Sequence, residues 1–290
     1  AGSSTLNTLT IRKNGAGVNP LITAYTGTST NGSAFQDGVW RLAGCDNVTI
    51  DGLDILDPNT TSPGWMEFGY GLFRYNPADG CQNNTIKNCT ITLSYLNNVA
   101  GSTYYGDGSR AIELVPATYT AHTTLLTING LNGTNSNNKF YGNLIQNCNA
   151  GINLFGYQDA LPFNYVDRNN DVGGSSAATS NTIINFGGGG VSGAAVAVRS
   201  YAQYNLNVSN NIINLSANAA YYWEMLFAIS GSTTSTASIG LSASGATGSV
   251  NYIVEATSAS AINSLGTPSS IWINTAGSVV VLPNTSQFQN

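Results

Sequence analysis

The chain has 290 residues, of which only 8% are charged and 42% are hydrophobic, and it carries a net charge of −5. Disordered chains are charge-rich and poor in aromatic residues, so this composition argues against disorder. Nine Lys plus Arg residues without a basic cluster argue against a nucleic-acid partner. No apolar run approaches the roughly 18 residues of a membrane span.

Two types of short apolar strand alternate along the chain. The first type lies in recurring phrases: LTIRKN from residue 9, NVTIDGLDI from 47, NNTIKNCTI from 83, NNKFYGNLI from 137, SNTIINF from 180, NLNVSNNII from 205 and VNYIVEA from 250. The second type comprises VWRLAG from 39, LFRYN from 72, AIELV from 111, INLFG from 152, AVAVRS from 195, LFAISG from 226 and SIWINTAG from 270. Gly, Asn and Ser turns separate these strands, and such residues favour turns and strands over helices.

This alternation predicts an all-β fold, a parallel β-helix of about seven coils. Period-2 strands in a fixed order, with turns of variable length, are typical of stacked solenoid coils. We expect one domain over residues 1–290, with long loops on one side and less regular C-terminal coils over 231–290. A seven-bladed propeller is the alternative, but each blade needs four strands.

A shift of 36 residues aligns GCDNVTIDGLDI, from residue 44, with GCQNNTIKNCTI, from residue 80. Under this shift Ile50, Leu53 and Ile55 fall on Ile86, Cys89 and Ile91. Equivalent residues of neighbouring coils lie about 4.8 Å apart, so these side chains should stack into an apolar ladder. On the exposed side, Lys87 should then form an ion pair with Asp51.

Cys45 and Cys81 also fall in register. A Cα separation of about 4.8 Å lies within the range that a disulfide tolerates. A Cys45–Cys81 disulfide and two free thiols stacked in a ladder are both compatible with this spacing.

Several of these phrases resemble secreted proteins of the pectate-lyase-like superfamily, which fold as right-handed parallel β-helices. The residues that carry the likeness are NVTIDGLDI, MEFGYGLFRYN at 66–76 and DGCQNNTIKNCTITL at 79–93. They are also similar to β-helical repeats of surface proteins that Bacteroidota export by type IX secretion. The resemblance covers most of residues 5–230 and implies an extracellular or cell-surface protein. Because the chain starts at Ala1 without a signal peptide, we expect a processed segment of a larger secreted protein.

The superfamily resemblance implies a polysaccharide lyase or glycoside hydrolase as one function. The candidate carboxylates are Asp46, Asp51, Asp54 and Asp57. Hydrolysis needs two carboxylates facing one sugar bond, but Lys87 and Thr90 occupy the matching places in the next coil. The single histidine, His122, leaves little room for a Ser-His-Asp triad or a histidine metal site. We therefore expect a non-catalytic protein and keep the enzyme as the alternative.

The second strand type predicts a row of outward-facing side chains. Period-2 alternation points Trp40, Leu42 and their equivalents inward, and the outward positions become Arg41, Arg74, Glu113 and Asn153. This row could hold an acidic sugar. The alternative is a solvated face in which Arg74 and Glu113 pair with each other.

Three loops that enter the same strand type combine aromatic rings with carboxylates. They contribute Trp65, Glu67, Tyr104, Tyr105, Asp107, Tyr222, Trp223 and Glu224. Rings can stack on the CH faces of sugars, and carboxylates can accept hydrogen bonds from hydroxyls. These residues are the predicted glycan-binding face; the alternative is that the rings cover the apolar side of the solenoid.

Residues Asp167, Asn169 and Asp171 alternate in DRNNDVGG, as in a calcium loop. Val172 replaces the glycine of that motif and the distal Glu is absent, so a polar turn is the alternative. Apart from this calcium hypothesis we expect no cofactor.

The sequence thus predicts an extracellular structural and adhesive solenoid, a surface fibre or stalk segment. Its expected partners are glycans or other surface proteins. No amphipathic capping helix is visible at either terminus, and an uncapped solenoid end offers strand edges to another chain. End-to-end self-association is therefore a further prediction.

Overall fold

The computed structural model describes residues 3–27, 37–59, 66–94, 108–121, 124–187 and 195–214, together with four short strands between 238 and 281. The chain divides into two compact units, Ala1–Tyr222 and Trp223–Asn290. Each unit is described by itself below.

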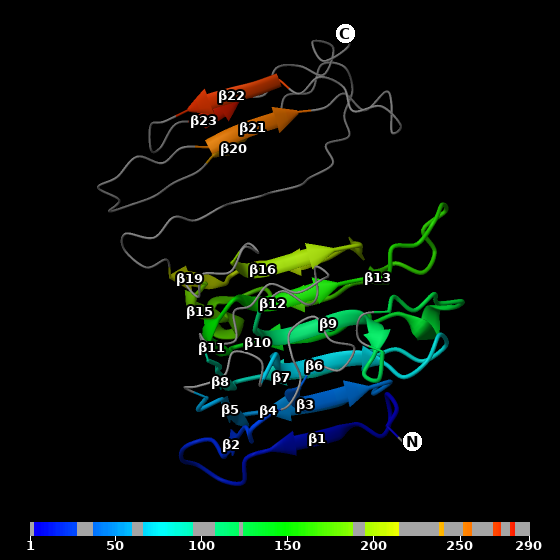
Figure 1. The fold of residues 1–290 in the computed structure, drawn as a ribbon, viewed down its shortest axis with the longest axis vertical. Coiled ribbons are helices and arrows are strands. Elements are labelled where there is room, and N and C mark those ends of the chain that lie inside the picture. Colours follow the sequence, from blue (N-terminus) through cyan, green and yellow to red (C-terminus); the bar gives the residue numbers. More distant parts are fainter. Residues whose placement is uncertain are drawn as a thin grey trace. The chain divides into compact units, whose positions relative to one another are not determined.

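Three parallel sheets build the first unit (Figure 1). Sheet A contains β1 (Leu9–Arg12), β4 (Val48–Asp51), β7 (Thr85–Lys87), β10 (Lys139–Tyr141), β14 (Asp171–Val172) and β18 (Asn207–Val208), in that order. Sheet B contains β2 (Leu21–Thr23), β5 (Asp54–Leu56), β8 (Thr90–Thr92), β11 (Leu144–Cys148), β15 (Thr182–Phe186) and β19 (Ile212–Asn214). Sheet C contains β3 (Gly38–Ala43), β6 (Phe68–Arg74), β9 (Arg110–Thr118), β12 (Ala150–Phe155) and β16 (Val196–Tyr201).

Each coil contributes one strand to each sheet, which makes the unit a parallel β-helix. Successive coils pair in parallel, with Ile50 opposite Ile86 and Ile55 opposite Ile91, as the 36-residue shift predicts. The described residues hold five complete coils and two strands of a sixth, fewer than the seven expected. The parallel pairing of all three sheets excludes the propeller.

The remaining elements are short. Strands β13 (Asp167–Arg168) and β17 (Gln203–Tyr204) pair in parallel, and two 3₁₀ turns, η1 (Leu131–Gly133) and η2 (Ala177–Thr179), interrupt the coils. None of the helical segments in the described part of the chain is long and apolar enough to cross a membrane.

The second unit differs from the coils that its sequence predicts. Strand β20 (Ser238–Gly240) pairs with β23 (Val279–Val281), and β21 (Tyr252–Ala256) pairs with β22 (Ser269–Ile273), both antiparallel. Strands of successive β-helix coils pair in parallel, so these four strands do not belong to regular coils.

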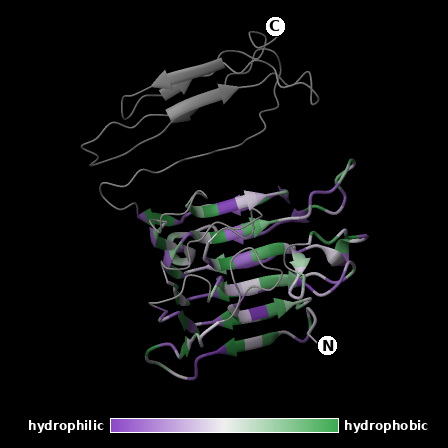
Figure 2. Cartoon of the chain, in the orientation of Figure 1, coloured by the Kyte–Doolittle hydropathy of each residue, from purple (hydrophilic) through white to green (hydrophobic). Residues whose placement is uncertain are grey.

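The core of the first unit consists of side-chain columns that run from coil to coil. Ile50, Ile86, Ile91 and Ile145 are at most 1% exposed. Apolar and polar segments alternate along the strands (Figure 2), as expected where one face of each strand lines a core. The predicted inward positions Leu42, Leu114 and Leu154 also belong to this core, together with their equivalents in sheet C.

A column of left-handed asparagines explains the recurring Asn before five of the six sheet A strands. Asn47, Asn83, Asn137, Asn169 and Asn205 have φ angles of 56°, 57°, 60°, 57° and 51°. Asparagine tolerates this backbone region better than other residues with a Cβ. The Asn of the NxTI phrase is therefore fixed by backbone conformation at the turn.

Two further asparagine ladders lie inside the turns. Asn84, Asn138 and Asn170 stack at one turn, and each side-chain oxygen accepts the backbone N–H of the coil before it, as from Asn84 N to Asn138 Oδ1 at 3.1 Å. At the next turn Asn143 and Asn181 do the same, and Asn211 Oδ1 accepts the side-chain amide of Asn181. Because these amides satisfy buried backbone groups, they tie neighbouring coils together.

Candidate functional site

The predicted outward residues of sheet C are register partners of one another, except that Gly71 takes the place expected for Arg74. Arg41, Gly71 and Glu113 are partners across β3, β6 and β9, and the row continues through Asn153 to Arg199. The prediction that Arg74 belongs to this row is wrong. The register shifts between Leu72 and Arg74 in β6, so Arg74 lies opposite Thr118.

Arg74 instead forms a buried ion pair with Asp167, 93 residues away, at 2.6 Å between Nη2 and Oδ1. Both side chains are completely buried. The guanidinium also donates to the carbonyl oxygens of Gly133 and Val115. Burial raises the pKa of Asp167 to about 6 against the opposing effect of Arg74. This pair joins β6 to β13 inside the protein, where no sugar is in reach.

The expected solvated face is also wrong for the centre of the row, since Glu113 and Asn153 are 0% exposed. Glu113 accepts a hydrogen bond from Arg110 Nε at 2.7 Å, and Arg110 is itself fully buried. Arg110 therefore takes the role expected of Arg74. At the end of the row Arg41 is exposed, and its guanidinium lies 5.7 Å from the centre of the Phe68 ring.

A second apolar cluster explains why this face is buried. Phe68, Phe73, Val115, Ala117 and Phe155 form it on β6, β9 and β12, apart from the main core. Phe73, Val115 and Phe155 directly follow the inward-facing leucines of their strands, so they lie on the opposite face. The middle strands of sheet C, β6, β9 and β12, are therefore buried on both faces, which period-2 alternation along one strand does not reveal.

Glu67 is the only member of the predicted glycan face within the described residues. It is completely buried, its Oε2 accepts the backbone N–H of Asp37 at 2.7 Å, and its Oε1 has no hydrogen-bond partner among the residues that the structure describes. Desolvation raises its pKa to about 8, although Arg110 opposes the shift. Glu67 is therefore a buried acid and no surface acceptor. Outside the described residues lie Trp65, Tyr104, Tyr105, Asp107, His122, Tyr222, Trp223 and Glu224.

The carboxylates of the run from Asp46 to Asp57 bind to the protein itself. Asp46 accepts the backbone N–H of Gln82 at 2.8 Å, and Asp54 accepts that of Thr90 at 2.6 Å. Asp51 pairs with Lys87 at 3.3 Å, as predicted, and accepts Asn88 Nδ2 at 2.7 Å. Burial raises the pKa of Asp57, which accepts the N–H of Asn59. Three of the four thus connect one coil to the next.

The three residues of the calcium hypothesis do not converge. Asp167 binds Arg74, and Asn169 exchanges amide hydrogen bonds with Asn137 and Asn205. Asp171 accepts bonds from Tyr141, Gly174 and Asn207. No cluster of three His, Cys, Asp or Glu side chains suited to a metal occurs among the described residues. The segment is a polar connection between coils.

All four cysteines are free thiols, so the structure has no Cys45–Cys81 disulfide. The buried Cys81 Sγ lies 3.2 Å from the carbonyl oxygen of Phe73, and the half-buried Cys45 Sγ lies 3.6 Å from that of Ala43. The two thiols occupy equivalent places in neighbouring coils, as predicted, but each points to a backbone acceptor. Burial raises the pKa of Cys81 to about 12, which keeps it protonated.

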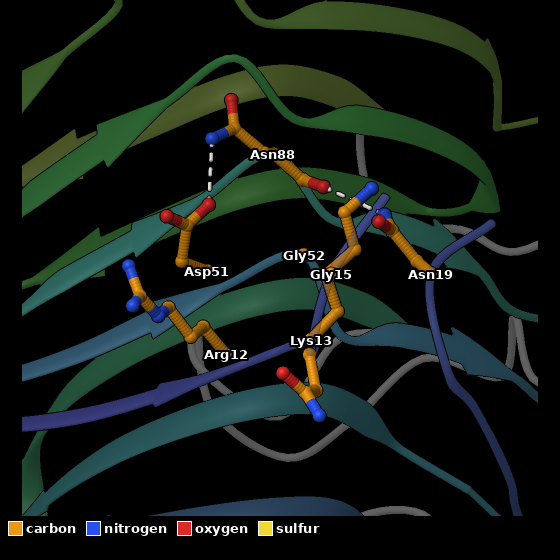
Figure 3. Close-up of a pocket in the computed structure, with 8 residues that line it drawn as sticks. Arg12, Lys13, Gly15, Asn19, Asp51, Gly52 and Asn88 are labelled. Atoms are coloured by element: carbon orange, nitrogen blue, oxygen red, sulfur yellow. Dashed lines mark hydrogen bonds between the residues drawn. The ribbon is translucent and has the colours of Figure 1, made fainter. Parts of the chain in front are cut away.

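One pocket opens beside the first coil, and sequence reasoning did not identify it (Figure 3). Its volume is about 510 Å³, and it is lined by polar and charged side chains and two glycines: Arg12, Lys13, Asn14, Gly15, Asn19, Asp51, Gly52 and Asn88. The turn between sheets A and B takes two residues in the next three coils, but eight residues separate β1 from β2. This longer loop leaves the hollow. The loop length and its Gly15 and Gly17, both at positive φ, were the available signals.

Comparison with models of protein families, with curated proteins and with solved structures gave no match.

Proposed function

We propose that this chain is a non-catalytic structural segment of an extracellular fibre or stalk, with adhesive capacity carried by its loops and its open end. The observation that carries the proposal is the open edge of the first coil. Strands β1, β2 and β3 each pair on one side only within the described residues. Leu9 and Leu21 on this edge are 50% and 56% exposed. Such an edge offers unpaired backbone groups beside apolar side chains to another strand.

The use of the charged residues supports a structural role over the enzymatic alternative. Asp46, Asp51 and Asp54 hold neighbouring coils together, and Glu67 and Glu113 are buried. An acid that acts on a polysaccharide must reach the scissile bond. Kinship with pectate-lyase-like proteins, export by type IX secretion and glycan binding by the aromatic loops remain parts of this proposal.

Light scattering over a range of protein concentrations tests the proposal. We expect the chain to associate as its concentration rises, and Leu9→Lys combined with Leu21→Lys to abolish association without lowering the melting temperature. Charged edge residues prevent strand pairing. A wild-type chain that stays monomeric at all concentrations, or turnover of a polysaccharide that Asp51→Ala abolishes, would overturn it.

A further inference from the structure

The strongest unexplained feature is the polar pocket beside the first coil, which does not depend on the structural role proposed above. Hydrogen bonds join its walls to one another. Asn19 Nδ2 donates to Asp54 Oδ1 at 2.8 Å and to the carbonyl oxygen of Asn88 at 2.9 Å. Figure 3 shows Asn88 between Asn19 and Asp51, with Arg12 and Lys13 on the side of the first coil. The long loop is thus fastened to the second and third coils.

The geometry of Gly52 helps to keep the wall closely packed. Its φ is +70°, and a Cβ there would lie 2.9 Å from Asn19 Oδ1. Glycine adopts this left-handed turn without strain, and the missing Cβ leaves room for the approach of Asn19. Lys13 Nζ donates to the carbonyl oxygen of Gly17 at 2.8 Å, which holds the ammonium group on the loop.

The charges of the pocket do not cancel. Asp51 is its only acidic lining residue, and both of its oxygens are engaged, Oδ2 by Lys87 and Oδ1 by Asn88. Arg12 lies beside Asp51 in register, but its guanidinium makes no ion pair or hydrogen bond with any described residue. Two basic residues, Arg12 and Lys13, thus line the pocket against one acidic residue, in a chain whose net charge is −5. The site concentrates positive charge in an acidic protein.

We propose that this pocket binds a sulfate or phosphate group. Three consecutive residues of its lining, Arg12, Lys13 and Asn14, carry a guanidinium, an ammonium and an amide group. Charge-assisted hydrogen bonds from guanidinium and ammonium groups to oxyanions are among the strongest in proteins. A tetrahedral oxyanion accepts donors from several directions, which fits three donors of different reach. The volume of about 510 Å³ leaves room for the sugar ring of a sulfated or phosphorylated glycan.

The test is an NMR titration of the ¹⁵N-labelled full chain with inorganic sulfate and inorganic phosphate, at ionic strength held constant with sodium chloride. We expect saturable shifts confined to amides of residues 12–19, 51–52 and 88. Arg12→Ala combined with Lys13→Ala should weaken binding at least tenfold. The matched control is Arg168→Ala, whose guanidinium lies over Tyr204 in another part of the fold, and it should leave the affinity unchanged.

A sulfated disaccharide and its unsulfated parent separate the two sources of the anion. Competition by the sulfated sugar alone would identify a glycan-linked group, whereas binding of the inorganic ions without the sugar would assign the pocket to free anions. Both outcomes support an oxyanion site. Shifts that chloride reproduces, or that persist in the double variant while its melting temperature is unchanged, would overturn the proposal. None of these results depends on self-association, because Leu9→Lys with Leu21→Lys leaves the pocket residues intact.

Discussion

The interior coils and the first coil follow the same sequence pattern but differ in burial. In the third coil Ile86 and Ile91 are 1% and 0% exposed, with a paired strand on each side. In the first coil the corresponding residues, Ile11 and Ile22, are only half-buried, because among the described residues their strands have a neighbour on one side only. The contribution of a column residue to stability therefore depends on its neighbours in both adjacent coils, as nearest-neighbour models of solenoids describe.

The largest expected effect is that of a charged residue placed in one core column, once in an interior coil and once in the first coil. Ile11, Ile50 and Ile86 occupy the same column. Ile86→Asp buries an unpaired carboxylate and should cost more than about 4 kcal/mol, enough to unfold the chain. Ile11→Asp, on the half-buried edge, should cost less than half as much. Urea denaturation followed by circular dichroism measures both, and equal costs would contradict the account.

The buried asparagine ladders should show the next largest effect. Asn138→Leu removes the acceptor of Asn84 N and the donor to the carbonyl oxygen of Cys81. It leaves these buried groups without partners, at about 1–3 kcal/mol each. Lys139→Ala, on the exposed neighbour, should change the free energy of unfolding by less than about 0.5 kcal/mol. A ladder variant as stable as this control would show that the amides are dispensable.

The buried acids should make stability depend on pH. Burial raises the pKa of Glu67 from 4.5 to about 8 and that of Asp167 from 3.8 to about 6. In these windows the folded chain binds more protons than the unfolded chain, so the free energy of unfolding should fall as pH rises. The loss from Glu67 should continue up to about pH 8.

The variant Glu67→Gln isolates this contribution. It should flatten the slope between pH 6 and 8, measured as thermal unfolding in matched buffers, while the effect of Asp167 at lower pH persists. A slope that survives the substitution would assign the pH dependence to other groups.

The smallest expected effect concerns the thiols. Burial raises the pKa of Cys81 and of Cys148 to about 12, and Cys45 alone is half-buried. Thiolates are the reactive form, so a thiol reagent should modify at most Cys45 in the native chain. In denaturant it should modify all four. Mass spectrometry after labelling gives the count, and two unreactive thiols in denaturant would reveal a disulfide.

The parallel fold could be predicted because equivalent positions of neighbouring coils carry the same kind of residue. Ile50 and Ile86 are both apolar, and Asn47 and Asn83 both occupy a backbone conformation that few residues tolerate. The ion pair between Lys87 and Asp51 followed from the same alignment. Local pattern therefore specified the strands, the register and the turns of the interior coils.

The candidate site was less predictable because it depends on contacts between distant segments. Arg74 leaves the outer row through a register shift and pairs with Asp167, which nothing in the sequence near either residue indicates. Glu67 and Glu113 are buried because the outer face of the middle strands of sheet C is also buried. Alternation along a strand indicates which residues face the core but not whether the opposite face is exposed. The pocket arises from the length of one loop, which carried no motif.

The central claim is that the interior coils have a paired neighbour on both sides and the first coil on one side only. Hydrogen exchange tests it most directly, measured by mass spectrometry at a concentration where the chain is monomeric. Exchange protection reflects local opening free energies. We predict the strongest protection in β7, β8, β10 and β11 and much faster exchange in β1 and β2. Protection of β1 and β2 equal to that of the interior strands would contradict the account, because it would show that the first coil already has a partner on both sides.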